Sequence, residues 1–393
     1  MLRNAKPASE PSIASQRNLA APRIDHVAAA PLKAHRPERA AAQSTAVVVC
    51  SSPDSSASDS DPSECGSDTD IPAQLTGVGF KNCGNTCYAA AMLQLRIARC
   101  PFARKTFYRR RKLCNIESAL LVVIVGAADI SALEPALAPF WKLWEQCDPT
   151  EFWISLTDAV MRCSGSPPRW AEGHVSTQSW STSPKSCRHV LVSGVQTAHF
   201  LDLPLVRSRG VLRVSTMLRQ LLSPTELEGK CEDCHSQDSV AQRAALPDVS
   251  RRMQLRLVLA RGATPPHDLF VTIKRFTPGE GHTIRLDHHV YADGLEVAFD
   301  RILAPEDFRN ESDDDDNGQP ELFAPLLLVK YRATAFVDHH GQATSGHYTA
   351  TARERDGNWY EYDDATVRQV PPPMALDGSG SPLPYAIRYS KMD

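Results

Sequence analysis

The sequence predicts an α+β fold, and three observations lead to this prediction. After residue 87 apolar residues recur at helical spacing, whereas the second half of the chain holds short runs rich in β-branched residues. Helices followed by strands are typical of α+β proteins, because α/β proteins alternate the two. All 27 aromatic residues lie at or after Phe80, so the folded part begins near that residue.

Residues 1–72 are predicted to form a disordered N-terminal tail, and residues 73–393 the folded domain. The tail has no aromatic residue and is rich in Ala, Ser and Pro, so it cannot bury enough apolar surface to offset the entropy lost on ordering. Its charge is asymmetric, since residues 1–45 carry a net +4 and residues 46–72 a net −6.

The stretch from residue 87 to about residue 162 is expected to be mainly helical. Two groups of apolar residues there have helical spacing: Met92, Leu93 and Ile97, then Phe152, Leu156 and Val160. The apolar run 119–128 suits a buried helix. Residues 164–186 turn to Ser, Pro and Trp, which predicts a loop.

The second half is expected to form strands separated by turns. The predicted strands are residues 255–259, 269–273, 326–329, 334–337 and 348–352. Two polar stretches, 261–267 and 305–320, are predicted surface loops, and the second contains four consecutive aspartates at 313–316.

Composition narrows the function classes. A net charge of −3 argues against a nucleic-acid-binding protein, which would have a basic domain. The longest apolar run has ten residues, too few to cross a bilayer. Eleven cysteines, an odd number without a recognisable secretory signal, favour thiols, a nucleophile or metal ligands over disulfides. We therefore expect a monomer in the cytoplasm, the nucleus or both.

One segment concentrates residues that suit nucleophilic chemistry. Residues 79–88 read GFKNCGNTCY, so two Asn and two Gly crowd before Cys87, where helical spacing begins. A thiol at a helix N-terminus has a lowered pKa, and the free N–H groups there can bind an oxyanion. The alternative is that Asn-Thr caps a helix and Cys87 is a small buried residue.

A partner for this cysteine occurs far downstream. His347 precedes a predicted strand, a turn follows at residues 356–357, and a second strand ends near Asp363. If the two strands pair antiparallel, the imidazole lies beside the carboxylate. A helix-borne Cys facing His and Asp on a sheet is the papain-like arrangement of nucleophile, base and orienting group.

These residues resemble the ubiquitin-specific proteases, which are cysteine deubiquitinases. The family cysteine box, approximately G-L-x-N-x-G-N-T-C-Y-M-N-S-x-L-Q, is similar to GFKNCGNTCYAAAMLQ at residues 79–94. Four further blocks follow in the family's order: QCDPTEF at 146–152, IKRF at 273–276, the histidine box from His339 to Asp364, and PYAIRY at 384–389. The resemblance covers about residues 77–391.

The resemblance implies a papain-like cysteine protease fold and a set of catalytic roles. The fold would have a helical thumb (about 77–165), β fingers (about 185–270) and a β palm (about 270–393). Cys87 would be the nucleophile, His347 the general base and Asp363 its orienting group. Asn82 would donate to the oxyanion, and Asp364 would assist near it or near a water.

The resemblance also implies contacts to the arginine-bearing ubiquitin tail. Asp148 and Glu151, three residues apart, are expected on one face of a helix, where two carboxylates would pair with those arginines. A solvated helix face is the alternative. The full set of predicted substrate-binding residues is Gln146, Asp148, Glu151, Phe152, His339 and Tyr348.

Two departures from the family pattern bear on activity and on metal binding. Met-Asn-Ser after Cys-Tyr is replaced by Ala89, Ala90 and Ala91, which removes supporting polar side chains. The family often binds zinc in the fingers through two Cys-x-x-Cys pairs. This chain offers one such pair and one Cys-x-His, either a structural zinc site or a decayed one; the four candidate ligands are Cys187, His189, Cys231 and Cys234. No cofactor is expected to be required for catalysis.

The tail contains a short pattern that resembles a SUMO-interacting motif. Val47, Val48 and Val49 precede residues 51–70, which hold eight Ser and six acidic residues. Such a strand could add to a partner sheet, and phosphorylation of Ser51 or Ser56 would add charge. An ordinary acidic linker is the alternative.

The sequence therefore predicts a thiol isopeptidase that cleaves after the C-terminal Gly-Gly of ubiquitin on modified proteins. Two alternatives remain open. The first is a ubiquitin-binding pseudoenzyme, suggested by Ala89–Ala91. The second is a protease for SUMO or another ubiquitin-like protein, suggested by the valine run.

Overall fold

The computed structural model divides the chain into two units, Met1–Cys65 and Gly66–Asp393, and every residue described below belongs to the second. The described residues are 78–98, 113–166, 168–171, 174–183, 187–205, 211–229, 249–278, 283–302, 327–342, 345–377 and 383–392. The predicted tail 1–72 lies outside them. Within these residues, no helix has the length and apolar character needed to cross a membrane.

Helices dominate the first part of the described chain, as the apolar spacing predicts. The α-helices are α1 (Cys87–Leu93), α3 (Asn115–Ile124), α4 (Glu134–Leu137) and α5 (Pro149–Ser164). A π-helical turn η3 (Gln94–Ala98) continues α1, and short 3-10 turns η4 (Ile130–Leu133) and η5 (Arg169–Ala171) complete the group. Helix α5 ends at Gly165, whose φ of 71° lies in the left-handed region that favours glycine.

The fingers and palm share one sheet, whose main path runs β16-β15-β14-β13-β12-β7-β1-β2. Its palm strands are β12 (Leu295–Arg301), β13 (Leu327–Gln342), β14 (Ser345–Arg353), β15 (Trp359–Asp363) and β16 (Thr366–Val370). Off this path, β17 (Pro384–Lys391) pairs with β13 and with β8 (Asp268–Lys274), and β8 pairs with β4 (Leu201–Pro204). The palm thus collects strands from distant parts of the chain.

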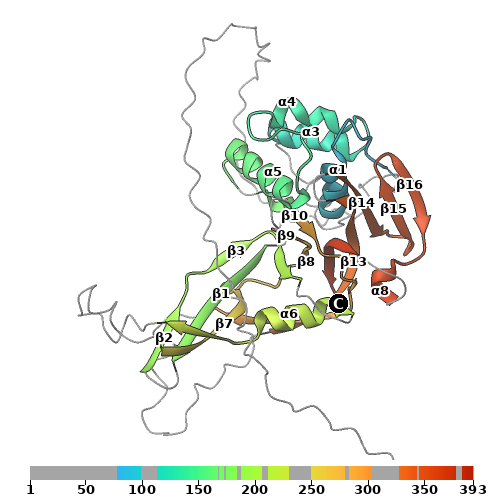
Figure 1. Cartoon of the computed structure of the whole chain (residues 1–393). Helices are drawn as coiled ribbons and strands as arrows, with labels where there is room; N and C mark the ends of the chain where they lie inside the picture. The colour runs from blue at the N-terminus through green and yellow to red at the C-terminus, as the bar shows by residue number, and fades with distance from the viewer. Residues whose placement is uncertain are drawn as a thin grey trace, which may run out of the picture. The chain divides into compact units, whose positions relative to one another are not determined.

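The finger strands extend away from α3 and α4 and run beside helix α6, residues Val214–Leu222 (Figure 1). They are β1 (Val175–Ser183), β2 (Cys187–Val192), β3 (Gln196–Ala198), β6 (Thr225–Gly229) and β7 (Val249–Leu259). Helix α6, short α8 (Met374–Asp377) and four short strands complete the fold: β5 (Leu212–Arg213), β9 (Phe276–Pro278), β10 (Thr283–Arg285) and β11 (Val290–Tyr291).

Two local predictions are wrong. The loop expected at residues 164–186 contains β1, which pairs antiparallel with β7 from Thr177–Leu257 to Thr182–Arg252. Pairing overrides the weak strand signal of its Ser-rich sequence. The strands expected at 326–329 and 334–337 are one strand, β13, because no Gly or Pro interrupts the chain between them.

The core that holds the site lies between the helices and the palm. All seven residues of α1 are buried, and α1 packs against both β14 and α5. Ala89, Ala90 and Ala91 are between 0 and 4% exposed, so small side chains fill this close contact. Helix α1 is therefore fixed on both sides, which sets the direction of its first residue, Cys87.

Candidate active site

The loop before Cys87 is organised by one side chain. Oδ1 of Asn82 accepts hydrogen bonds from the backbone N–H groups of Gly84 (3.0 Å) and Thr86 (3.2 Å) and from the Thr86 hydroxyl (3.1 Å). Gly84 and Asn85 adopt positive φ angles of 102° and 52°, which Gly and Asn tolerate best. The turn delivers Cys87 to the first position of α1, as the sequence predicts.

Cys87 is a buried thiol that touches the strand carrying the histidine. It is 3% exposed, and α1, which it begins, packs against β14. Burial raises the pKa of the Cys87 thiol, the backbone of Tyr348 on β14 opposes this, and the negative charge of Asp364 raises the pKa further. The isolated protein therefore holds a neutral thiol on the helix that packs against the strand of His347.

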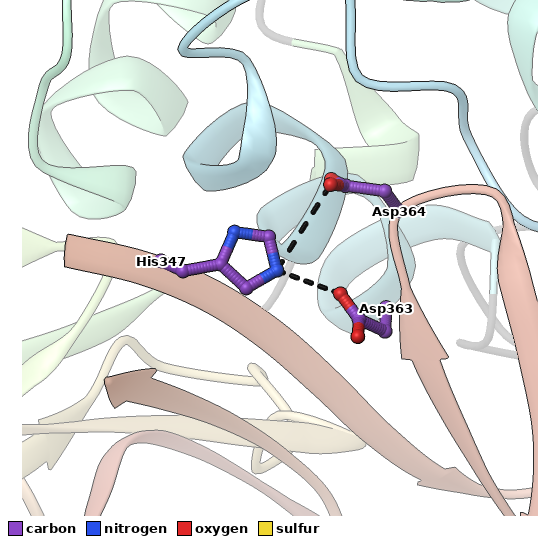
Figure 2. A group of neighbouring side chains, drawn as sticks. All are labelled: His347, Asp363 and Asp364. Atoms are coloured by element: carbon purple, nitrogen blue, oxygen red, sulfur yellow. Dashed lines mark hydrogen bonds and ion pairs between the residues drawn. The ribbon is translucent and has the colours of Figure 1, made fainter. Parts of the chain in front are cut away.

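His347 and Asp363 lie on neighbouring strands, as the sequence predicts. Strands β14 and β15 pair antiparallel, and Nε2 of His347 lies 2.7 Å from Oδ1 of Asp363. Nε2 also lies 3.9 Å from Oδ2 of Asp364. Figure 2 shows both interactions ending on this same ring nitrogen. Since Nε2–H donates to Asp363, Nδ1 is the nitrogen left to accept a proton.

Asp364 connects the histidine to the cysteine loop. Its Oδ2 accepts a hydrogen bond of 3.1 Å from Nδ2 of Asn82, and its backbone carbonyl accepts one of 2.8 Å from Phe80 N–H. Burial raises the Asp364 pKa, the Asn82 hydrogen bond and His347 lower it, and Asp363 raises it. A Cβ at Gly79 would lie 2.5 Å from the Asp364 carbonyl oxygen, so glycine is required for this close approach.

Among the described residues, His347, Asp363 and Asp364 form one group whose side chains could hold a metal ion. Donor atoms of His347, Asp363 and Asp364 all lie within 4.8 Å of one another. The bonds of His347 to Asp363 and of Asn82 to Asp364 already account for this clustering, so the group needs no ion. The predicted zinc ligands Cys231 and Cys234 lie outside the described residues, and Cys187 and His189 are described only by their backbone in β2. The zinc site stays a prediction.

Contrary to what their spacing predicts, Asp148 and Glu151 do not share one helix face. Asp148 is the N-cap of α5 rather than part of the helix, and its Oδ1 accepts from the backbone N–H groups of Thr150 (2.7 Å) and Glu151 (3.3 Å). Glu151 lies in the first turn and is exposed. Gln146 donates from Nε2 to the carbonyl of Gly346, 3.0 Å away, and so links the helical side to the start of β14.

Three predicted substrate-binding residues lie inside the protein. Phe152, His339 and Tyr348 are 0, 3 and 5% exposed, so in the isolated protein they offer almost no surface to a substrate. The His339 ring packs against Tyr348 (centroids 4.6 Å apart) and Phe276 (5.2 Å), and burial lowers its pKa to about 4. These residues can support the site by packing.

One contact beside these residues was not predicted from the sequence. The hydroxyl of Tyr385, at the start of β17, donates to Oδ2 of Asp148 at the start of α5. The only sequence signal was the PYAIRY block at residues 384–389, which marks a strand but assigns no role to this hydroxyl.

Comparisons with known proteins identify the family of this chain. A family model described as ubiquitin carboxyl-terminal hydrolase matches residues 78–385. Human ubiquitin carboxyl-terminal hydrolase 17-like protein 11 is 24% identical over 311 residues, which cover 74% of this chain and 52% of that protein. For the human 17-like protein 6 the identity is again 24%, over 74% of this chain and 69% of that protein. The chain thus spans about half the length of the first of these relatives.

Solved structures show the same fold at low identity. A SAGA Ubp8/Sgf11/Sus1/Sgf73 DUB module bound to ubiquitin aldehyde gives a TM-score of 0.58 at 17% identity, covering 80% of this chain and 70% of that one. A yeast SAGA DUB module with an Sgf73 mutant gives 0.57 at 16% identity, over 80% and 68% of the two chains. At these identities the likeness supports the fold alone.

Proposed function

Because this chain belongs to the ubiquitin carboxyl-terminal hydrolase family, a family of cysteine proteases, we propose that it is a thiol isopeptidase that cleaves after the C-terminal Gly-Gly of ubiquitin. One observation carries the proposal: α1, which begins at Cys87, packs against β14, the strand of His347, while His347 Nε2 bonds to Asp363. The proposed nucleophile and its proposed base thus lie on elements that pack against each other.

The geometry supports a definite sequence of steps. Nδ1 of His347 accepts the Cys87 proton, and Sγ attacks the carbonyl carbon of the terminal ubiquitin glycine. Asn82 Nδ2 and the N–H groups at the start of α1 would stabilise the oxyanion. His347 then protonates the lysine amine, which leaves, and water hydrolyses the ubiquitin thioester to restore the thiol.

The raised pKa of Cys87 specifies how this reaction begins. A buried neutral thiol requires His347 to act as a general base during attack, because a preformed thiolate would be unfavourable beside Asp364. Asp364 contributes by holding Asn82 Nδ2, and Asp363 by holding the imidazole with Nδ1 directed away from the carboxylates.

Ubiquitin recognition is proposed at the start of α5. Glu151 is exposed and offers a carboxylate to the arginines of the ubiquitin tail, and Asp148 beside it adds negative charge. Gln146, two residues before Asp148, bonds to the carbonyl of Gly346, which precedes His347. We propose that the ubiquitin tail passes these three side chains on its way to Cys87.

The pseudoenzyme alternative has one observation in its favour, the raised pKa of Cys87. Against it, the alanines that prompted it are buried on α1, while Asn82, His347, Asp363 and Asp364 keep their mutual bonds. The SUMO-directed alternative depends on Val47–Val49, outside the described residues.

One experiment separates the three functions. Wild-type protein and Cys87→Ala are incubated with ubiquitin or SUMO that carries a thiol-reactive group at its C-terminus. A covalent adduct with ubiquitin alone, absent in Cys87→Ala, is the expected result. Ubiquitin binding without an adduct would favour the pseudoenzyme, and an adduct with SUMO alone would favour the other substrate.

Two further predictions concern regions outside the described side chains. Metal analysis of the purified chain tests the structural zinc, and less than about one zinc per two chains would exclude a Cys187, His189, Cys231 and Cys234 site. NMR titration of a peptide spanning residues 40–65 with SUMO tests the docking role of Val47–Val49, which an absence of chemical-shift changes would exclude.

A further inference from the structure

The carboxylate of Asp148 joins two elements from opposite sides of the site. Its Oδ1 caps α5 through Thr150 and Glu151, while its Oδ2 accepts the hydroxyl of Tyr385 at the start of β17. Each oxygen therefore serves a different element. Residues 148 and 385 are 237 positions apart in sequence, so this bond ties the thumb to the palm.

On the thumb side, a short chain of contacts leads from Asp148 to the nucleophile. Phe152, one turn into α5, packs edge-on against Tyr88 with ring centroids 5.6 Å apart. Tyr88 follows Cys87 on α1, and its hydroxyl donates to the Leu143 carbonyl at 2.9 Å. The start of α5 and the start of α1 are thereby packed as one unit.

On the palm side, Tyr385 contacts the strand that carries the base. Its ring lies 5.6 Å from that of Tyr348, at an interplanar angle of 74°. Tyr348 follows His347 on β14, the strand against which α1 packs, and its backbone lowers the Cys87 pKa. Tyr385 is 4% exposed, and burial raises the pKa of its hydroxyl, so it stays a donor at neutral pH.

From this arrangement we infer that Asp148 and Tyr385 form a thumb–palm clamp that positions Cys87 against His347. The inference rests on the proposed thiol chemistry and gives Asp148 a positioning role besides its charge. The bond from Gln146 to Gly346 is a second tie beside it, at the residue that precedes His347. Tyr385 is thus a positioning residue, since it acts on the reacting groups through Tyr348.

The test is Tyr385→Phe, which removes the hydroxyl and keeps the ring packed on Tyr348. Reaction of Cys87 with iodoacetamide is followed between pH 6 and 10 and quantified at the Cys87 peptide by mass spectrometry, because the chain has 11 cysteines. This reaction reports the thiol without ubiquitin. Loss of this buried charge-assisted hydrogen bond is expected to slow Cys87 alkylation about 5-fold at pH 8. The midpoint of the pH profile of alkylation should move to higher pH.

Tyr331→Phe is the matched control. Tyr331 is a fully buried palm tyrosine whose hydroxyl donates to the Pro266 carbonyl at 2.8 Å, so the variant loses the same group and one hydrogen bond. It should lose somewhat less stability, because its partner is a neutral carbonyl, and keep the wild-type pH profile. A merely structural role for Tyr385 predicts the same profile for both variants, and that result would overturn the clamp.

A second variant covers the case in which Tyr385→Phe does not fold. Asp148→Ser keeps an N-capping oxygen but has no second oxygen to accept the Tyr385 hydroxyl, so slower Cys87 alkylation is again expected. Alkylation of Asp148→Ser at the wild-type rate would overturn the clamp. Failure of the proposed function is a separate outcome, in which wild-type protein does not hydrolyse ubiquitin substrates although its Cys87 alkylates faster than that of Tyr385→Phe.

Discussion

Gly346→Ala is predicted to inactivate the protein through a contact directly beside the base. A Cβ at residue 346 would lie 1.9 Å from His339 Nε2 and 2.5 Å from its Cε1. His339 cannot turn away freely, because it is 3% exposed and packed between Phe276 and Tyr348. Either the ring or the start of β14 must therefore move.

The size of the movement follows from these distances. Ordinary van der Waals contact begins at 3.4 Å, so Cβ and Nε2 must separate by about 1.5 Å. Residue 346 precedes His347, so the strand shift displaces the imidazole from Cys87. A misplacement of about 1 Å at reacting groups costs roughly 100-fold in rate, and we expect kcat/KM to fall by that factor. Overpacking should also cost about 1–3 kcal/mol of stability.

The assay is hydrolysis of a ubiquitin C-terminal fluorogenic amide, with folding checked by circular dichroism. Gly294→Ala is the matched control, because the nearest atom to its added Cβ is the Tyr331 carbonyl oxygen at 3.8 Å. His339→Ala combined with Gly346→Ala should restore much of the lost rate, since neither ring nitrogen of His339 has a hydrogen-bond partner among the described residues. Wild-type kcat/KM in Gly346→Ala, or no recovery in the double variant, would refute the steric explanation.

Three further predictions follow from the site and its surroundings. Asp363→Asn should lower kcat by at least about 100-fold in the same hydrolysis assay, because the amide can hold the wrong imidazole tautomer; an unchanged kcat would exclude Asp363 as the orienting group. Asp364→Asn should speed iodoacetamide alkylation of Cys87 roughly threefold at pH 8, because it removes a charge that raises the Cys87 pKa. The same variant should slow hydrolysis, because it weakens the hydrogen bond that holds Asn82. Burial, and then the nearby charges of His174 and Arg96, lower the His199 pKa to about 3. Below about pH 6.5 the unfolded chain therefore binds a proton at His199 that the folded chain does not bind. The urea midpoint should therefore fall as pH decreases from 7 to 4, and His199→Gln should flatten this slope.

Sequence patterns that constrain the local backbone predicted the fold best. Asn and Gly before Cys87 require a turn with positive φ angles, and the structure begins α1 at Cys87. The antiparallel strands around His347 and Asp363 follow from two apolar runs and one Asp-Gly turn. Strand β1 was missed because its Ser- and Thr-rich sequence carries little apolar alternation, and the β7 residues that pair with it lie 70 to 80 positions away.

Site residues whose positions follow from local sequence spacing could be predicted. Contacts between residues far apart in the sequence could not. Asp148-Pro149 is an N-cap followed by proline at the first helical position, a pattern that places Asp148 before the helix rather than on its face. The contact of Asp148 with Tyr385 joins residues 237 positions apart, and no local pattern announces it. Burial of Phe152 likewise depends on the packing of α5 against α1.

The central claim, that Cys87 forms a thioester with ubiquitin, is tested most directly by acid-quenched intact mass spectrometry during turnover of a ubiquitin substrate. The account predicts a protein–ubiquitin adduct that hydroxylamine removes, that maps to Cys87, and that is absent in Cys87→Ala. Turnover by Cys87→Ala, or an adduct mapped to another residue, would contradict it.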